Sequence, residues 1–157
     1  MATTGLALLL AAFLYNFKKP QAFVIFIVSL VYILNLWISQ SALDQYLNEY
    51  IGYYVSQSLF EVLVVLLLAQ APSKCGVAIM SLCLVSVLVN IVGFSLEALL
   101  IAQDSAINNL MWVLFFMQIA VFFSKGILDV LFRAITKPAL FRVFCLDYLR
   151  VNIESAE

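Results

Sequence analysis

Four apolar stretches dominate the sequence, and each is long enough to cross a lipid bilayer as an α-helix. A spanning helix needs about 20 predominantly apolar residues, because the hydrocarbon core of a bilayer is about 30 Å thick. The stretches cover residues 20–38, 51–69, 76–102 and 107–124. Within hydrocarbon a helix satisfies every backbone hydrogen bond internally. The sequence therefore predicts an all-α polytopic membrane protein, with four transmembrane helices forming a single domain over residues 1–157.

The overall composition excludes two broad classes of protein. Hydrophobic residues make up 66% of the chain and charged residues 11%. Soluble domains average about 45–50% hydrophobic residues and about 25% charged residues. A soluble globule of this size cannot bury so much apolar surface, so a soluble enzyme is excluded. Intrinsic disorder needs low hydrophobicity and high charge, and is excluded as well.

Residues 5–17 form a fifth apolar stretch, which is short for a span. It is apolar on all sides and so lacks the polar face of a helix that lies on a membrane surface. A secretory signal peptide would have a basic residue before the stretch and a small-residue cleavage site after it, and neither is present. We expect a short helix that dips into the bilayer beside the first span, and a fifth span is the alternative.

The basic residues predict the orientation of the chain. With four spans, all eight Lys and Arg residues fall on one side, at positions 18–19, 74 and 125–150. The loops on the other side, at 39–50 and 103–106, carry acidic residues and no basic ones. By the positive-inside rule the basic side is cytoplasmic. We expect an integral protein of the bacterial inner membrane with a cytoplasmic C-terminus.

The predicted outer ends of the spans carry residues typical of a membrane interface. Trp37 and Trp112 lie near the outer ends of the first and fourth spans, as expected for an aromatic belt. Residues 39–50 have apolar positions at helical spacing, which predicts a short helix on the outer surface.

The segment after the fourth span, residues 125–157, is predicted to be an amphipathic cytoplasmic tail. Its basic residues are Lys125, Arg133, Lys137, Arg142 and Arg150. Such residues favour helices lying at the inner headgroup layer, against anionic lipid. The other interpretation is a docking surface for a cytoplasmic protein.

Three strongly polar residues share one depth in the predicted bilayer. Glu61, Asn90 and Gln118 lie ten to twelve residues from the outer ends of the second, third and fourth spans. At about 1.5 Å per residue this corresponds to roughly 15–18 Å, close to the bilayer centre. Polar groups at this depth are costly and are candidates for function. The three helices are thus predicted to contribute to one polar layer.

Two helical faces extend this layer toward the outer surface. The faces are Tyr54, Gln57, Ser58 and Glu61 on the second span, and Ser86, Asn90, Gly93 and Glu97 on the third. The candidate intramembrane site therefore consists of Glu61, Asn90, Gln118, Gln57 and Glu97. These groups suit proton or cation handling, but they also suit ordinary hydrogen bonding between helices.

Several kinds of chemistry have no sequence support. The chain has no histidine, its three cysteines form no CxxC pair, and no carboxylates are paired for metal or acid–base work. It also lacks the GxxxxGK[ST], GxGxxG and GxSxG motifs. We therefore expect no enzymatic activity, catalytic residue, metal or cofactor. Few basic residues are present, so no nucleic-acid partner is expected.

Three functions are compatible with these features. We favour a non-enzymatic membrane protein that forms a homo-oligomer and acts as a pore, an ion channel or a membrane-sensing subunit with a cytoplasmic partner. Phage-defence, immunity or exclusion proteins have this character. The first alternative is a small proton- or cation-coupled transporter with Glu61 as the coupling carboxyl group. A holin-like lysis protein is the second alternative.

Overall fold

Every regular element in the described part of the chain is an α-helix, and these residues contain no strand. The computed structural model describes residues 2–38, 49–70, 73–99 and 104–135. The helices are α1 (Ala2–Asn16), α2 (Gln21–Ile38), α4 (Glu49–Ala69), α5 (Lys74–Ala98), α6 (Asp104–Phe123) and α7 (Lys125–Ile135). The predicted all-α class is therefore confirmed.

Three of the described helices are long and apolar enough to cross a membrane. They are Gln21–Ile38, Lys74–Leu96 and Ala106–Phe123. The apolar segment of α4, Tyr54–Ala69, is shorter. The fold is thus that of a protein compatible with membrane insertion, and the fourth span remains a prediction.

Two helix boundaries differ from the prediction because serine side chains cap the helices. The Ser73 hydroxyl accepts a hydrogen bond of 2.9 Å from the Gly76 backbone N–H, so α5 begins at Lys74 rather than at Gly76. The Ser124 hydroxyl accepts one of 3.3 Å from the Ile127 N–H, which starts α7 directly after α6. At its other end α5 stops at Ala98, short of the predicted 102.

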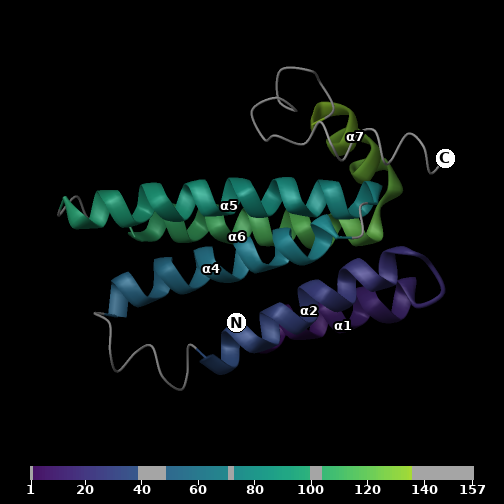
Figure 1. Ribbon diagram of the computed structural model, residues 1–157, viewed down its shortest axis with the longest axis horizontal. Helices are drawn as coiled ribbons and strands as arrows, with labels where there is room; N and C mark the ends of the chain where they lie inside the picture. The colour runs from purple at the N-terminus through teal and green to yellow at the C-terminus, as the bar shows by residue number, and fades with distance from the viewer. Residues whose placement is uncertain (1, 39–48, 71–72, 100–103, 136–157) are drawn as a thin grey trace.

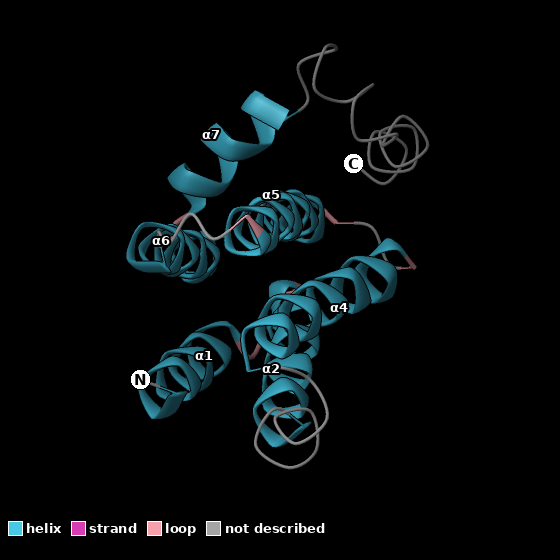
Figure 2. Cartoon of the chain, turned by 90° about the vertical axis from the view of Figure 1, so that its left-hand side faces the viewer, coloured by secondary structure: helices cyan, strands magenta, loops and turns pink. Residues whose placement is uncertain are grey.

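Five helices form a closed ring when the molecule is viewed end-on (Figure 2). The ring runs α1–α2–α4–α5–α6, and α1 completes it by packing against α6. The short helix α7 packs on the ends of α5 and α6. This arrangement leaves α2, α4, α5 and α6 facing a common interior.

The helix α1 is an integral part of the ring. One face, formed by Gly5, Leu9, Ala12 and Asn16, is buried, while Leu14 on the opposite face is 66% exposed. Its 15 residues extend about 22 Å, at about 1.5 Å per residue, which is less than the hydrocarbon thickness of about 30 Å. The helix is therefore the short apolar element that the sequence predicted, packed beside α2.

The basic residues of the described chain lie at one end of the bundle. The α1–α2 turn carries Lys18 and Lys19, and α5 begins with Lys74. Figure 1 shows this turn, the start of α5 and the α6–α7 junction, where Lys125 begins α7, all toward the right. The one-sided charge distribution agrees with the predicted topology, and its cytoplasmic placement stays a prediction.

The predicted tail and outer loop are described only in part. Residues Lys137, Arg142 and Arg150 lie outside the described residues, as do residues 39–48 of the predicted outer helix. Within α7, Arg133 is exposed and Leu128 is buried.

The bundle buries several polar residues within a largely apolar interior, and the outer surface of its helices is apolar. Buried polar residues include Asn16, Asn35, Ser86, Asn90 and Gln118. Exposed residues include Leu59 and Leu66 on α4, Leu88 and Ile91 on α5, and Phe116 on α6. Such a distribution suits hydrocarbon as the surrounding solvent, because polar groups find partners only between helices.

Candidate binding cavity

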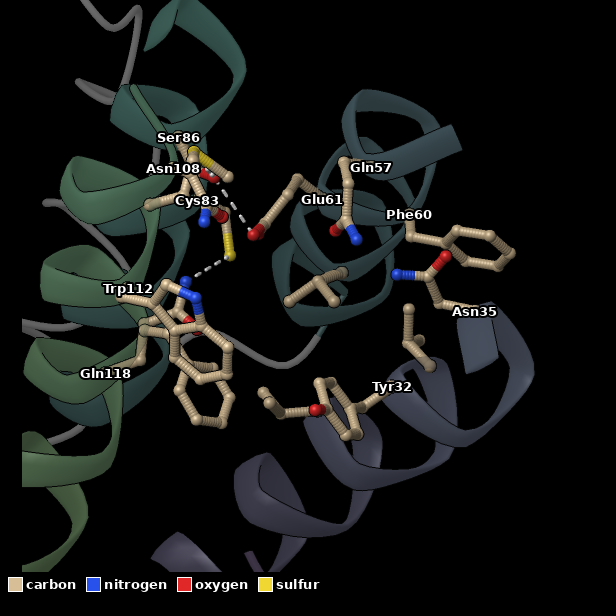
Figure 3. Close-up of a pocket in the computed structure, with 15 residues that line it drawn as sticks. Tyr32, Asn35, Gln57, Phe60, Glu61, Cys83, Ser86, Asn108, Trp112 and Gln118 are labelled. Atoms are coloured by element: carbon tan, nitrogen blue, oxygen red, sulfur yellow. Dashed lines mark hydrogen bonds between the residues drawn. The ribbon is translucent and has the colours of Figure 1, made fainter. Parts of the chain in front are cut away.

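A cavity of about 330 Å³ lies between α2, α4, α5 and α6 (Figure 3). Its polar lining residues are Asn35, Gln57, Glu61, Cys83, Ser86, Asn108 and Gln118, and its aromatic lining residues are Tyr32, Phe60, Trp112 and Phe115. The remaining walls are formed by Val28, Val31, Val64 and Met111. The cavity combines apolar walls with several convergent polar groups, which is typical of a small-molecule site.

The Glu61 carboxyl group is directed from α4 toward α5 across one side of the cavity (Figure 3). Its Oε1 atom accepts a hydrogen bond of 3.1 Å from the Ser86 hydroxyl. The Cys83 thiol and the Gln118 amide also face this carboxyl group. Glu61 carries the one carboxyl group among the lining residues, and no lysine or arginine lines the cavity. A charge on Glu61 therefore has no balancing cation from the described residues that surround it.

The Gln118 side chain brings α6 into contact with the polar side chains around Glu61. Its Nε2 atom donates a hydrogen bond to the Cys83 sulfur at 3.7 Å, within the longer range usual for sulfur acceptors. The structure thus brings Glu61 and Gln118 together in one cluster of polar side chains, as their equal predicted depth suggests.

Asn90 occupies a different environment from the other two residues of the predicted layer. It lies one helical turn beyond Ser86 on α5, is fully buried and is not among the residues that line the cavity. Neither its Nδ2 nor its Oδ1 atom has a hydrogen-bond partner in the described part of the chain. A buried amide without partners is costly. The expected interhelical hydrogen bond of Asn90 is therefore not observed among these residues.

The outer polar faces of α4 and α5 meet where a glycine allows close approach. Gln57 lines the cavity one turn from Glu61. Beyond it, a Cβ atom on Gly93 would lie 2.7 Å from Cε1 of Tyr54, so the tyrosine ring fills the space left by the glycine. Glu97 belongs to α5, but its side chain lies outside the described residues.

An aromatic wall that the sequence interpretation missed lies opposite Glu61. Tyr32 of α2 stacks on Phe115 of α6, with ring centroids 5.6 Å apart and an interplanar angle of 25°. Trp112 packs edge-on against Phe115 at 5.9 Å. Trp112, assigned from sequence to an interfacial belt, thus lines the cavity. The signal was present, because Asn108, Met111, Trp112, Phe115 and Gln118 share one helical face.

Asn35 and Asn108 are two further polar lining residues that sequence reasoning did not single out. Asn35 is buried on α2, and its Oδ1 atom has no hydrogen-bond partner among the described residues. It follows Val28, Val31 and Tyr32 at helical spacing, so the whole inner face of α2 contributes to the cavity.

The described residues do not assemble a metal centre. They contain no group of three or more Cys, Asp or Glu side chains placed to hold a metal ion. The cavity instead offers one carboxyl group, one thiol, amides and aromatic faces.

Comparisons with family models, with curated proteins and with solved structures found no match to this chain.

Proposed function

We propose that this protein is a small membrane transporter that exchanges protons for cations. The Glu61 carboxyl group binds either a proton or a cation, and each displaces the other. The observation that carries the proposal is the position of the Glu61 carboxyl group in a cavity shared by α2, α4, α5 and α6. In a medium of low dielectric constant an isolated negative charge is strongly disfavoured. The carboxyl group must therefore hold a proton or a cation, and one carboxyl group cannot hold both. This mutual exclusion is the physical basis for coupling two fluxes.

The location of the polar groups favours a transporter over a pore between subunits. A pore between subunits needs polar side chains on the outward faces of the helices near mid-membrane. The outward faces of α4 and α5 there carry Leu59, Leu66, Leu88 and Ile91, which are exposed and apolar. The polar groups converge instead within one chain. The oligomeric pore, the membrane-sensing subunit and the holin remain predictions from sequence.

We further propose that the protein acts as a homo-oligomer in the cytoplasmic membrane. Transporters are commonly built from paired structural repeats, and one chain with no internal repeat would obtain the second half from another copy. Native mass spectrometry in detergent measures this directly, and a strictly monomeric species would contradict it.

Cation-driven proton flux in proteoliposomes tests the transport proposal. Vesicles with an acidic interior and a trapped pH indicator receive external Na⁺, K⁺, tetramethylammonium or benzyltrimethylammonium in turn. We expect at least one cation to raise the internal pH, and Glu61→Gln to abolish this response because an amide cannot exchange a proton.

The matched control is Asp129→Asn, which removes an exposed carboxyl group on α7. This variant should retain the flux of the wild type. If no cation elicits proton efflux, or if Glu61→Gln transports as well as the wild type, the transport proposal is rejected.

A further inference from the structure

We propose that the cavity selects a lipophilic monovalent organic cation, namely a quaternary ammonium ion carrying a single aromatic ring. This inference depends on the proposed function and specifies the substrate class of the same site. It rests on the charge, the aromatic wall and the size of the cavity.

The charge of the lining residues favours a monovalent cation over other ligands. Glu61 is the one acidic residue among them, and the lining includes no basic residue. The described lysines, Lys18, Lys19, Lys74 and Lys125, lie in the α1–α2 turn or at helix N-termini. An anion would have no counter-charge in the cavity. A zwitterion could pair its positive group with Glu61, but its negative group would have no counter-charge. Burying an unpaired charge is costly, so both are disfavoured.

The aromatic wall favours an organic cation over an inorganic one. Tyr32, Phe115 and Trp112 form a continuous set of rings, with centroid separations of 5.6 and 5.9 Å. Figure 3 shows Trp112 and Tyr32 across the cavity from Glu61. Aromatic faces attract cations within about 6 Å, and quaternary ammonium ions are typical ligands of such surfaces. Small metal cations instead require several oxygen ligands around the ion, and Glu61 is the only carboxylate among the lining residues, where the other oxygen donors are neutral amides and hydroxyls.

The cavity has room for about one ring and a small ammonium group. Its volume of about 330 Å³ lies at the lower end of the range of about 300–1,000 Å³ for drug-sized ligands. Val28, Val31 and Val64 provide an apolar surface for the hydrocarbon part of the ligand. Benzyltrimethylammonium has this shape, and neopentylbenzene is its neutral counterpart with carbon in place of nitrogen.

Equilibrium binding to the full-length protein in lipid nanodiscs provides the test. We expect saturable binding of radiolabelled benzyltrimethylammonium that neopentylbenzene competes for only weakly. Glu61→Gln should abolish binding. Trp112→Leu should weaken it about tenfold, because the variant loses the ring face that a desolvated cation contacts. Trp112→Phe, which keeps a ring, should show a smaller loss.

A second measurement on the wild-type protein avoids dependence on variants that fold poorly. Dicyclohexylcarbodiimide adds to a protonated carboxyl group to give an O-acylisourea, which rearranges to a stable N-acylurea without any other reactant. Mass spectrometry should locate this adduct on Glu61, and benzyltrimethylammonium should prevent its formation because the cation displaces the proton.

The control for the aromatic wall is Phe116→Leu. Phe116 lies next to Trp112, with ring centroids 5.9 Å apart, but is 52% exposed on the outer face and does not line the cavity. This variant should bind like the wild type. Equal weakening by Phe116→Leu and Trp112→Leu would overturn the proposal, as would equally effective competition by neopentylbenzene.

The outcome separates this inference from the proposed function. If Na⁺ or K⁺ drives proton flux that requires Glu61 while benzyltrimethylammonium does not bind, the substrate class is wrong and the transporter stands. If benzyltrimethylammonium binds and no cation drives flux, the cavity is a cation-binding site and transport is wrong.

Discussion

The amide nitrogen of Asn16, at the end of α1, donates a hydrogen bond of 2.9 Å to the backbone carbonyl of Phe122, at the end of α6. A second bond of 3.0 Å runs to the carbonyl of Ala12 on its own helix. Asn16 is fully buried. This side chain joins the first and last helices of the ring across most of the sequence.

Replacing Asn16 with leucine should therefore loosen α1 from α6. The substitution roughly conserves volume and removes both donated bonds, so we expect a loss of about 1 kcal/mol of unfolding free energy. Unfolding of the detergent-solubilised protein by added SDS measures the change. Asn109→Leu, at an exposed position of α6, is the control and should unfold like the wild type. Identical midpoints for the Asn16 variant and the wild type would contradict a stabilising role.

The two glycines Gly93 and Gly126 should respond oppositely to alanine. At Gly93 a Cβ atom would lie 2.7 Å from the Tyr54 ring and 3.1 Å from Ile107 Cγ2, so Gly93→Ala should destabilise the protein by about 1–3 kcal/mol. At Gly126 the nearest atom is Ser124 Oγ at 3.8 Å, so Gly126→Ala should be neutral or stabilising, by up to about 1 kcal/mol.

A second-site substitution tests the cause of the Gly93 effect. Tyr54→Leu shortens the side chain that meets the added methyl group, so the double variant should regain part of the lost stability. If Tyr54→Leu only adds to the destabilisation, the steric explanation is wrong. Thermal unfolding in detergent provides the measurement.

Ser86→Ala should weaken cation binding at Glu61 without unfolding the bundle. The Ser86 hydroxyl donates to Glu61 Oε1, and hydrogen bonds to charged groups contribute about 1.5–3 kcal/mol, so we expect an affinity at least about tenfold lower. Ser81→Ala is the matched control, because Ser81 is buried on the same helix and its hydroxyl donates to the backbone carbonyl of Val77 within that helix. Equal effects of the two variants would mean that Ser86 acts through packing alone.

Cysteine labelling should place the basic end of the bundle on one side of the membrane. In spheroplasts of an expressing bacterium, single cysteines at Lys18, Lys74 and Lys125 should be protected from a membrane-impermeant thiol reagent until the cells are permeabilised. A cysteine at Asn109, near the opposite end of α6, should react at once. Reaction of the Lys18 and Lys74 variants from different sides would contradict the predicted topology.

The helix α7 should lie in the membrane interface with its two exposed faces in different surroundings. Val130 is 69% exposed although it is apolar, and its neighbour Asp129 is exposed and charged. Oxygen concentrates in hydrocarbon, so it should reach a spin label at Val130 more readily than one at Asp129. A water-soluble nickel complex should reach the label at Asp129 more readily than the one at Val130. The same accessibility at both positions would argue against an interfacial helix.

Much of the site could be anticipated from sequence because helical spacing assigns residues to faces. The placement of Gln57 and Glu61 on one face of α4 followed from their separation by four residues, and both line the cavity. The equal depth of Glu61 and Gln118 followed from counting residues along predicted spans. Neither inference required knowledge of which helices are neighbours.

The sequence by itself determined the helical class, the approximate helix bounds and the one-sided distribution of the basic residues, because these depend on local hydrophobicity and charge. Only the tertiary structure decided which helices surround Glu61, because helix packing depends on side-chain shape across many residues. It brought Tyr32, Phe115 and Trp112 into one wall and left Asn90 without a partner among the described residues. It also placed α1 against α6 through Asn16, a contact between residues separated by 106 positions that no local pattern encodes.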